Sequence, residues 1–177
     1  NSDPVHKISI VSRGHAGGYT LKLPLEERRL QARREFLDDI AVSLGGYVAE
    51  LMIFGDVTTG PSNDLRVGTA LARDMVTKYG MSDEFGPIAV EESSGKSFIG
   101  QSGGEREYSE SVGAKIDAEV KEIIDTALGR AEEILKEKRS VLEAIADKLI
   151  EVETIERADF EDLLIANGIT PKKEKNK

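Results

Sequence analysis

The sequence of 177 residues contains no cysteine and no tryptophan, and only 5% of its residues are aromatic. The absence of cysteine excludes disulfide bonds and thiolate-bound zinc, and it is compatible with a reducing compartment. No stretch approaches the roughly 20 consecutive apolar residues that cross a bilayer. We therefore expect a globular chain that reaches a membrane, if at all, through other segments.

Positive charge is also scarce, because 24 basic residues stand against 33 acidic residues and the net charge is −9. The only basic cluster is the final segment, 172–177, for which we expect a disordered basic tail. A chain without a basic stripe or patch is a poor ligand for phosphate backbones. Nucleic acid is therefore not an expected partner.

The alternation of apolar and polar residues predicts two short strands near the N-terminus, within about Pro4–Leu23. Apolar residues at helical spacing predict a helix over Arg33–Phe54, in which Gly45 and Gly46 stand in the middle. Each glycine there costs about 1 kcal/mol relative to alanine, so we expect a neighbouring helix to pack very close to this pair. The sequence thus predicts a mainly α fold with a small N-terminal β element.

Further helices are predicted towards the C-terminus. A long periodic run begins near Ser109, Ser140 with Glu143 has the spacing of a capping box, and Thr154 is the expected N-cap of a last helix ending at Gly168. Before these helices we expect a strand at Pro87–Val90 and then a flexible polar stretch over 91–107. A length of 177 residues fits one domain, or one domain with an appended element.

One carboxylate, that of Asp64, is placed where it could serve chemistry. A turn over Phe54–Gly60 precedes a helix whose expected N-cap is Ser62 or Asn63 and which Gly80 closes, so Asp64 falls in the first helical turn. The helix dipole favours an ionised acid there. This suits a metal ligand, which binds as an anion, and it suits an ordinary capping acid equally well.

Three other features are weaker candidates. Gly95-Lys96-Ser97 resembles part of a phosphate-binding loop but lacks the glycine five positions earlier. His6 and His15 are isolated and form no ligand-spaced pair, which favours structural or exposed roles. Glu50 lies in an apolar run, where both solvent exposure and a buried supporting role at a site remain open.

Taken together, several segments resemble the peptidase domain of the FtsH family, the membrane-anchored AAA+ zinc metalloproteases. The segments are Asp3–Ile10, Gly17–Thr20, Leu44–Glu50, Phe54–Leu65, Ala72–Ser82 and Phe85–Pro87, followed by the C-terminal helices. The block Thr58–Leu65 together with Tyr79–Ser82 is the most specific part. The resemblance covers almost the whole chain.

The resemblance implies that Asp64 is the third protein ligand of a zinc ion, beside two histidines of an HExxH helix. It implies that Asn63, Thr58 and Thr59 shape the loop, that Glu50 supports it, and that Gly68 leaves room for the metal-bearing helix. Gly17, Gly18, Tyr19 and Thr20 match an edge strand to which polypeptide substrates add. A homo-hexamer, ATP and magnesium in a separate ATPase module, and a place at the cytoplasmic face of a bacterial inner membrane or an organellar equivalent are implied as well.

This sequence contains no HExxH motif, no ATPase module and no membrane anchor. We therefore expect 1–171 to be the C-terminal part of a zinc metallopeptidase domain, with a site-proximal part at 1–107 and C-terminal helices at 108–171. Such a chain would be inactive alone, although the intact protein would be an ATP-dependent metalloendopeptidase. The alternative is a non-catalytic helical interaction module, a pseudoprotease of the same fold.

Overall fold

The computed structural model describes residues 3–12, 17–23, 30–90 and 108–171. The chain divides into two compact units, one formed by Asn1–Leu30 with Ile134–Lys177 and the other by Gln31–Glu133. Helices dominate and one small sheet is present, which confirms the predicted fold class. No helix within the described residues is both long and apolar enough to span a membrane.

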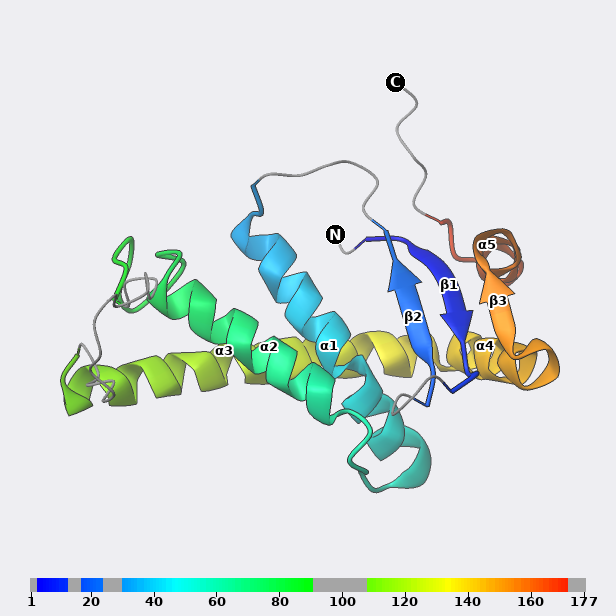
Figure 1. The fold of residues 1–177 in the computed structure, drawn as a ribbon, viewed down its shortest axis with the longest axis horizontal. Coiled ribbons are helices and arrows are strands. Elements are labelled where there is room, and N and C mark those ends of the chain that lie inside the picture. The colour runs from blue at the N-terminus through cyan, green and yellow to red at the C-terminus, as the bar shows by residue number, and fades with distance from the viewer. Residues whose placement is uncertain (1–2, 13–16, 24–29, 91–107, 172–177) are drawn as a thin grey trace, which may run out of the picture. The chain divides into compact units, whose positions relative to one another are not determined.

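The first unit is built on a three-stranded antiparallel sheet, β1 (Val5–Ser9), β2 (Tyr19–Lys22) and β3 (Thr154–Glu156), in the order β2-β1-β3 (Figure 1). The two N-terminal strands are those that the sequence predicts, but β3 was not predicted. Ile155 at its centre is only 1% exposed, and Ser9 Oγ lies 2.8 Å from Thr154 Oγ1 across the β1–β3 pair. The prediction that Thr154 caps the last helix is therefore wrong, because this residue belongs to the sheet.

Two helices complete this unit, α4 (Arg139–Val152) and α5 (Arg157–Ala166). The predicted capping box at Ser140 is wrong, because α4 begins one residue earlier and Glu143 accepts a hydrogen bond from Arg139 Nε at 2.9 Å instead. After α5, Gly168 adopts a left-handed conformation with φ of 76°. The N–H of Ile169 then donates to the Leu164 carbonyl at 2.9 Å, so the helix ends where the glycine predicts.

The second unit is built on α1 (Arg33–Phe54), α2 (Ser62–Thr77) and α3 (Glu110–Glu137). The bounds of α1 are those predicted. The buried core residues recur at helical spacing in all three helices: Phe36, Ile40, Ala41, Leu44, Val48, Ala72, Met75, Val76, Ile116, Val120, Ile123, Ala127 and Ala131. Burial of these apolar stripes, at about 25 cal/mol per Å², holds the helices together.

Gly68 is the residue at which α2 comes closest to α1. A Cβ atom built on Gly68 would lie 3.5 Å from Ser43 Cβ and 3.8 Å from Ile40 Cγ2, in ordinary van der Waals contact with α1. Gly68 therefore faces α1, and the expectation that it leaves room for a metal-bearing helix is wrong. No described residue comes within 4 Å of a Cβ atom built at Gly45 or Gly46, so the close neighbour expected there is neither α2 nor α3.

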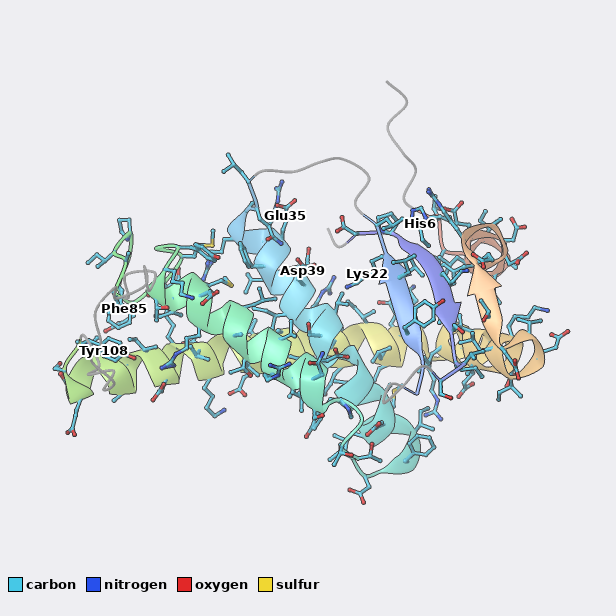
Figure 2. The ribbon with its side chains drawn as sticks, viewed as in Figure 1. His6, Lys22, Glu35, Asp39, Phe85 and Tyr108 are labelled. Carbon is cyan, nitrogen blue, oxygen red and sulfur yellow. The ribbon has the colours of Figure 1, made fainter. Side chains whose placement is uncertain are left out.

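The C-terminal end of α2 leads into a turn that contains Phe85 (Figure 2). Gly80 has a left-handed conformation with φ of 59°, and a Cβ atom built on it would lie 3.1 Å from Pro87 Cα. Both observations favour glycine at this position. The predicted strand at Pro87–Val90 is wrong, because this segment folds back on α2 and Val90 N–H donates to the Thr77 carbonyl at 2.8 Å. The polar stretch 91–107 lies outside the described residues, as does the tail at 172–177.

A buried carboxylate on α3, that of Glu119, holds this turn. It accepts hydrogen bonds from Ser82 Oγ at 2.6 Å and from Asp83 N–H at 2.7 Å, while Ser82 Oγ in turn accepts from Phe85 N–H at 2.7 Å. Both Glu119 and Ser82 are buried. A buried carboxylate is tolerated only when it is paired, and here the backbone and hydroxyl of the turn supply the donors.

Candidate metal-binding site

The Asp64 carboxylate projects from the first turn of α2. The N-cap of this helix is Pro61, one residue before the predicted N-caps, and no side chain caps it. Asp64 is the third helical residue and its side chain is exposed. Among the residues that the structure describes, no hydrogen bond or ion pair engages this carboxylate, so its oxygens remain available to a ligand.

The loop before Asp64 is fixed to α1 by Glu50. Its Oε2 accepts from Thr58 N–H at 2.7 Å and its Oε1 accepts from Thr58 Oγ at 3.0 Å. The Thr58 hydroxyl oxygen then accepts from Gly60 N–H at 3.0 Å. Glu50 is half-buried, and its carboxylate accepts hydrogen bonds from the loop.

The structure thus brings Glu50 and Thr58 together. Gly60 also belongs to this hydrogen-bonded loop, although the sequence alone did not predict it as a site residue. A Cβ atom at Gly60 would lie 3.1 Å from Glu50 Oε1 and 3.2 Å from Thr58 Oγ. Both distances are tighter than an ordinary side-chain contact, so this position favours glycine. In the sequence, the only indication of this role is that Gly60 stands between the Thr58-Thr59 pair and Pro61.

Thr59 and Asn63 complete the start of α2. The Thr59 carbonyl accepts from Ser62 N–H at 3.2 Å, which joins the loop to the first helical residue. The Asn63 side-chain oxygen accepts from Arg66 Nη2 at 2.7 Å, so it serves a neighbour on the helix rather than the loop. Both residues are exposed.

The predicted substrate strand is found in the other unit. Tyr19 and Thr20 lie in β2, at the edge of the described sheet, and pair with Ser9 and Ile8 of β1. A Cβ atom at Gly18 would lie 2.5 Å from the Ser9 carbonyl oxygen, so only glycine lets the chain pass this close to β1. Gly17 just before it is exposed.

His6 is the one histidine in the part of the chain that the structure describes, and it lies in the unit that does not contain Asp64. His6 lies on β1 (Figure 2), where its Nε2 is 3.4 Å from Arg157 Nη1, and His15 lies outside the described residues together with Gly95-Lys96-Ser97. In the described part of the chain, no three His, Cys, Asp or Glu side chains gather as a metal site would need. A zinc site normally takes three or four protein ligands, so the described residues do not by themselves complete such a site around Asp64.

A cavity of about 550 Å³ lies away from Asp64, near the other end of α2. Its lining comes from the start of α1, the turn after α2 and the middle of α3, and includes Arg33, Glu84, Lys115 and Glu119. Lys115 Nζ donates to Glu84 at 2.5 Å, and this hydrogen bond lowers the pKa of the Glu84 carboxyl. Asp64 lies near the start of α2, about 13 residues before its end at Thr77, which is about 20 Å at 1.5 Å per residue, so the cavity is not part of the candidate site.

Comparison with known proteins identifies the family. The model of peptidase family M41 matches residues 1–163. The chain is 47% identical over 164 residues to the ATP-dependent zinc metalloprotease FtsH 1 of Sphaerobacter thermophilus, covering 92% of this chain and 25% of that protein. It is 44% identical over 174 residues to the ATP-dependent zinc metalloprotease FtsH of Bacillus subtilis, covering 97% of this chain and 27% of that protein.

A third relative gives the same picture. The ATP-dependent zinc metalloprotease FtsH of Thermotoga maritima is 45% identical over 166 residues, covering 93% of this chain and 27% of that protein. The chain thus spans about a quarter of the length of the curated relatives it matches. With the family match extending over residues 1–163, the chain belongs to peptidase family M41.

Proposed function

We propose that this chain is part of a longer protein that is an ATP-dependent zinc metalloendopeptidase, and that Asp64 supplies one of its zinc ligands. The observation that carries the proposal is the family match over residues 1–163, because relatives at 44–47% identity are named as zinc metalloproteases. The exposed Asp64 carboxylate, which has no partner among the described residues, supports the assignment.

A zinc ion held there would supply Lewis-acid chemistry for the hydrolysis of a peptide bond. The residues of this chain would have two tasks at such a site. Asp64 offers an anionic oxygen at the start of α2. Glu50 and Thr58 hold the loop before α2, because hydrogen bonds join Thr58 to the Glu50 side chain on α1. The other ligands would come from the HExxH helix that the family resemblance places before Asp3.

The polypeptide substrate would bind along β2. Main-chain groups at an edge strand accept an extended peptide as a further strand, and this mode needs little side-chain specificity. The edge position of β2 and the requirement for glycine at Gly18 support this role for Gly17–Thr20. The longer protein would act as a homo-hexamer at the cytoplasmic face of a membrane, with ATP and magnesium bound by a separate ATPase module.

The test is Asp64→Asn in the longer protein. The amide keeps the shape of the side chain but removes the charge that zinc requires, so zinc per subunit and casein degradation should fall at least about tenfold. ATP hydrolysis should persist, because it belongs to another module. If Asp64 only stabilised the helix start, the change would cost about 1 kcal/mol or less and leave zinc content and cleavage intact.

The wild-type protein provides the second arm of this test. Absence of zinc and of proteolysis in the wild-type longer protein, with normal ATP hydrolysis, would favour the non-catalytic interaction module of the same fold. Inspection of the reading frame before Asn1 for an HExxH motif gives the same distinction without an assay.

A further inference from the structure

One asparagine in the sequence is followed by glycine, and this residue, Asn167, stands at the end of α5. The other asparagines precede serine, aspartate and lysine. The side-chain amide of an asparagine can be attacked by the backbone nitrogen of the next residue, and glycine there favours the attack because it has no Cβ atom to obstruct that nitrogen. The pair Asn167-Gly168 is therefore the most reactive of its kind in this chain.

The end of α5 requires glycine at this position. The N–H of Gly168 donates to the Ile165 carbonyl at 3.0 Å, and the N–H of Ile169 donates to the Leu164 carbonyl at 2.9 Å. These two hydrogen bonds form a Schellman motif, in which the residue after the C-cap is left-handed. Because Gly168 has φ of 76°, a residue with a Cβ atom would be strained there. The glycine that ends the helix is thus also the glycine that makes Asn167 reactive.

The Asn167 side chain belongs to the same helix end. Its Nδ2 donates to the Leu163 carbonyl at 2.8 Å, while the Gly168 nitrogen is bonded to Ile165. The two groups that would react are therefore each held by a different carbonyl. Asn167 and Gly168 are both exposed, so water and solvent base reach them once these hydrogen bonds open.

Little apolar packing opposes such an opening. None of the 10 residues of α5 is buried, although Leu163 and Leu164 are half-buried. A helix end of this kind opens locally at a free-energy cost far below that of global unfolding. The last turn of α5 therefore opens much more often than the whole chain unfolds, and each opening releases both reacting groups.

We propose that Asn167 is a site of spontaneous deamidation in the folded chain, and that the product loosens the end of α5. In the open turn the Gly168 nitrogen gives its proton to solvent base and attacks Asn167 Cγ. A C–N bond forms, the bond between Cγ and Nδ2 breaks, and Nδ2 takes a proton from solvent and leaves as ammonia. Water then hydrolyses the cyclic imide at either carbonyl, which yields aspartate or isoaspartate. This chemistry is independent of the proposed function.

Either product weakens the helix end. The amide that donates to the Leu163 carbonyl becomes a carboxylate, which cannot donate and which is repelled by that carbonyl. A negative charge at the C-terminal end of a helix is also opposed by the helix dipole. Isoaspartate in addition lengthens the main chain by one carbon atom, which disrupts the spacing of the Schellman motif at Gly168.

The first experiment follows deamidation of this chain by peptide mapping and mass spectrometry, in native buffer and in guanidinium chloride. Asn167 should be modified faster than Asn63 in both conditions. Its rate in native buffer should be about five- to thirtyfold below its rate in denaturant, because the last turn is closed most of the time. The rate should rise with pH, since the attacking nitrogen must lose a proton, and isoaspartate should accompany aspartate.

Three results would overturn the proposal. Equal rates in both conditions would mean that the hydrogen bonds at the end of α5 do not protect the pair. A native rate as low as the global unfolding equilibrium of the same chain allows would mean that the local opening does not occur. Aspartate without isoaspartate would mean direct hydrolysis of the amide, without ring closure onto Gly168.

The second experiment tests the consequence with Asn167→Asp, which supplies one product directly. Amide hydrogen exchange at Gly168 and Ile169 should become at least about fourfold faster than in the wild type. Thr170→Asp is the matched control, because it adds the same charge nearby but keeps the Asn167 amide, and it should change these rates by less than about twofold. Unchanged exchange in Asn167→Asp, or equal acceleration in both variants, would show that loss of this amide does not loosen the helix end.

Discussion

The Thr58 hydroxyl links Glu50 to the backbone of Gly60, so one oxygen atom connects α1 to the loop before Asp64. Sequence alone placed both Glu50 and Thr58 near the candidate site but could not show that they touch. They lie eight residues apart across a turn, and only the conformation of the loop decides whether they meet. This contact gives the loop residues a physical task that can be tested.

We expect Thr58→Val in the longer protein to lower zinc affinity by about tenfold while reducing stability by only about 0.5–1.5 kcal/mol. Valine keeps the shape of threonine but removes both hydroxyl bonds, so the loop loses its link between Glu50 and Gly60. The measurement is zinc affinity by competition with a chelator, alongside chemical denaturation.

Thr58→Ser is the matched control, because serine retains the hydroxyl and should keep zinc affinity close to that of the wild type. Equal losses for valine and serine would mean that packing of the methyl group, and not the hydrogen bonds, holds the loop. The loss of zinc-binding free energy in the double variant Glu50→Gln with Thr58→Val should be smaller than the sum of the losses in the two single variants, since both changes remove the same contact.

Sequence patterns located the helices more accurately than their caps. The period of apolar residues gave α1 and the start of α3 directly, because burial of one face imposes that period. The predictions of N-caps at Ser140 and Thr154 are wrong, because a short polar side chain occurs equally well at a cap, inside a helix or in a strand. The sequence predicts Thr154 as a cap, but Thr154 pairs with Ser9, 145 residues away, and no local pattern carries such long-range information.

The sequence does not predict the hydrogen bonds between α3 and the turn after α2, which Glu119 accepts from Ser82 and Asp83. Glu119 stands on the buried stripe of α3, between Ile116 and Val120, and a carboxylate in an apolar stripe was the available signal. Its partners, the Ser82 hydroxyl and the Asp83 amide, could not be deduced from spacing. They belong to a turn whose conformation depends on the left-handed Gly80.

Glu119→Ala should destabilise this chain by about 2–3 kcal/mol, because it leaves the buried Ser82 hydroxyl and the part-buried Asp83 amide without their acceptor. Glu122→Ala is the matched control, since Glu122 is an exposed glutamate one turn along the same helix and should change stability by no more than about 0.5 kcal/mol. Chemical denaturation of both variants gives the comparison. Equal effects would show that Glu119 contributes no more than a surface charge.

At the scale of the whole molecule, the first unit joins the N-terminal strands to a strand and two helices from the C-terminal part of the chain. This arrangement depends on the pairing of β1 with β3, which sequence patterns do not reveal. Family membership, by contrast, was accessible from sequence, because Thr58–Leu65 and Tyr79–Ser82 are specific blocks. The candidate site stays a prediction from sequence, a set of residues whose contacts with one another no sequence pattern gives.

The chain by itself should bind zinc weakly and cleave no protein. Asp64 offers one carboxylate, and the described residues bring no other two metal-binding side chains to it, whereas a zinc site that activates water uses three protein ligands. Isothermal titration with zinc should therefore show no tight one-to-one binding, and a casein assay should show no cleavage that a chelator inhibits. Asp64→Asn in this chain should leave both results unchanged, in contrast to its effect in the longer protein. Tight stoichiometric binding that disappears in Asp64→Asn would mean that this chain already holds the remaining zinc ligands. The proposal that the other ligands come from an HExxH helix outside this chain would then be wrong.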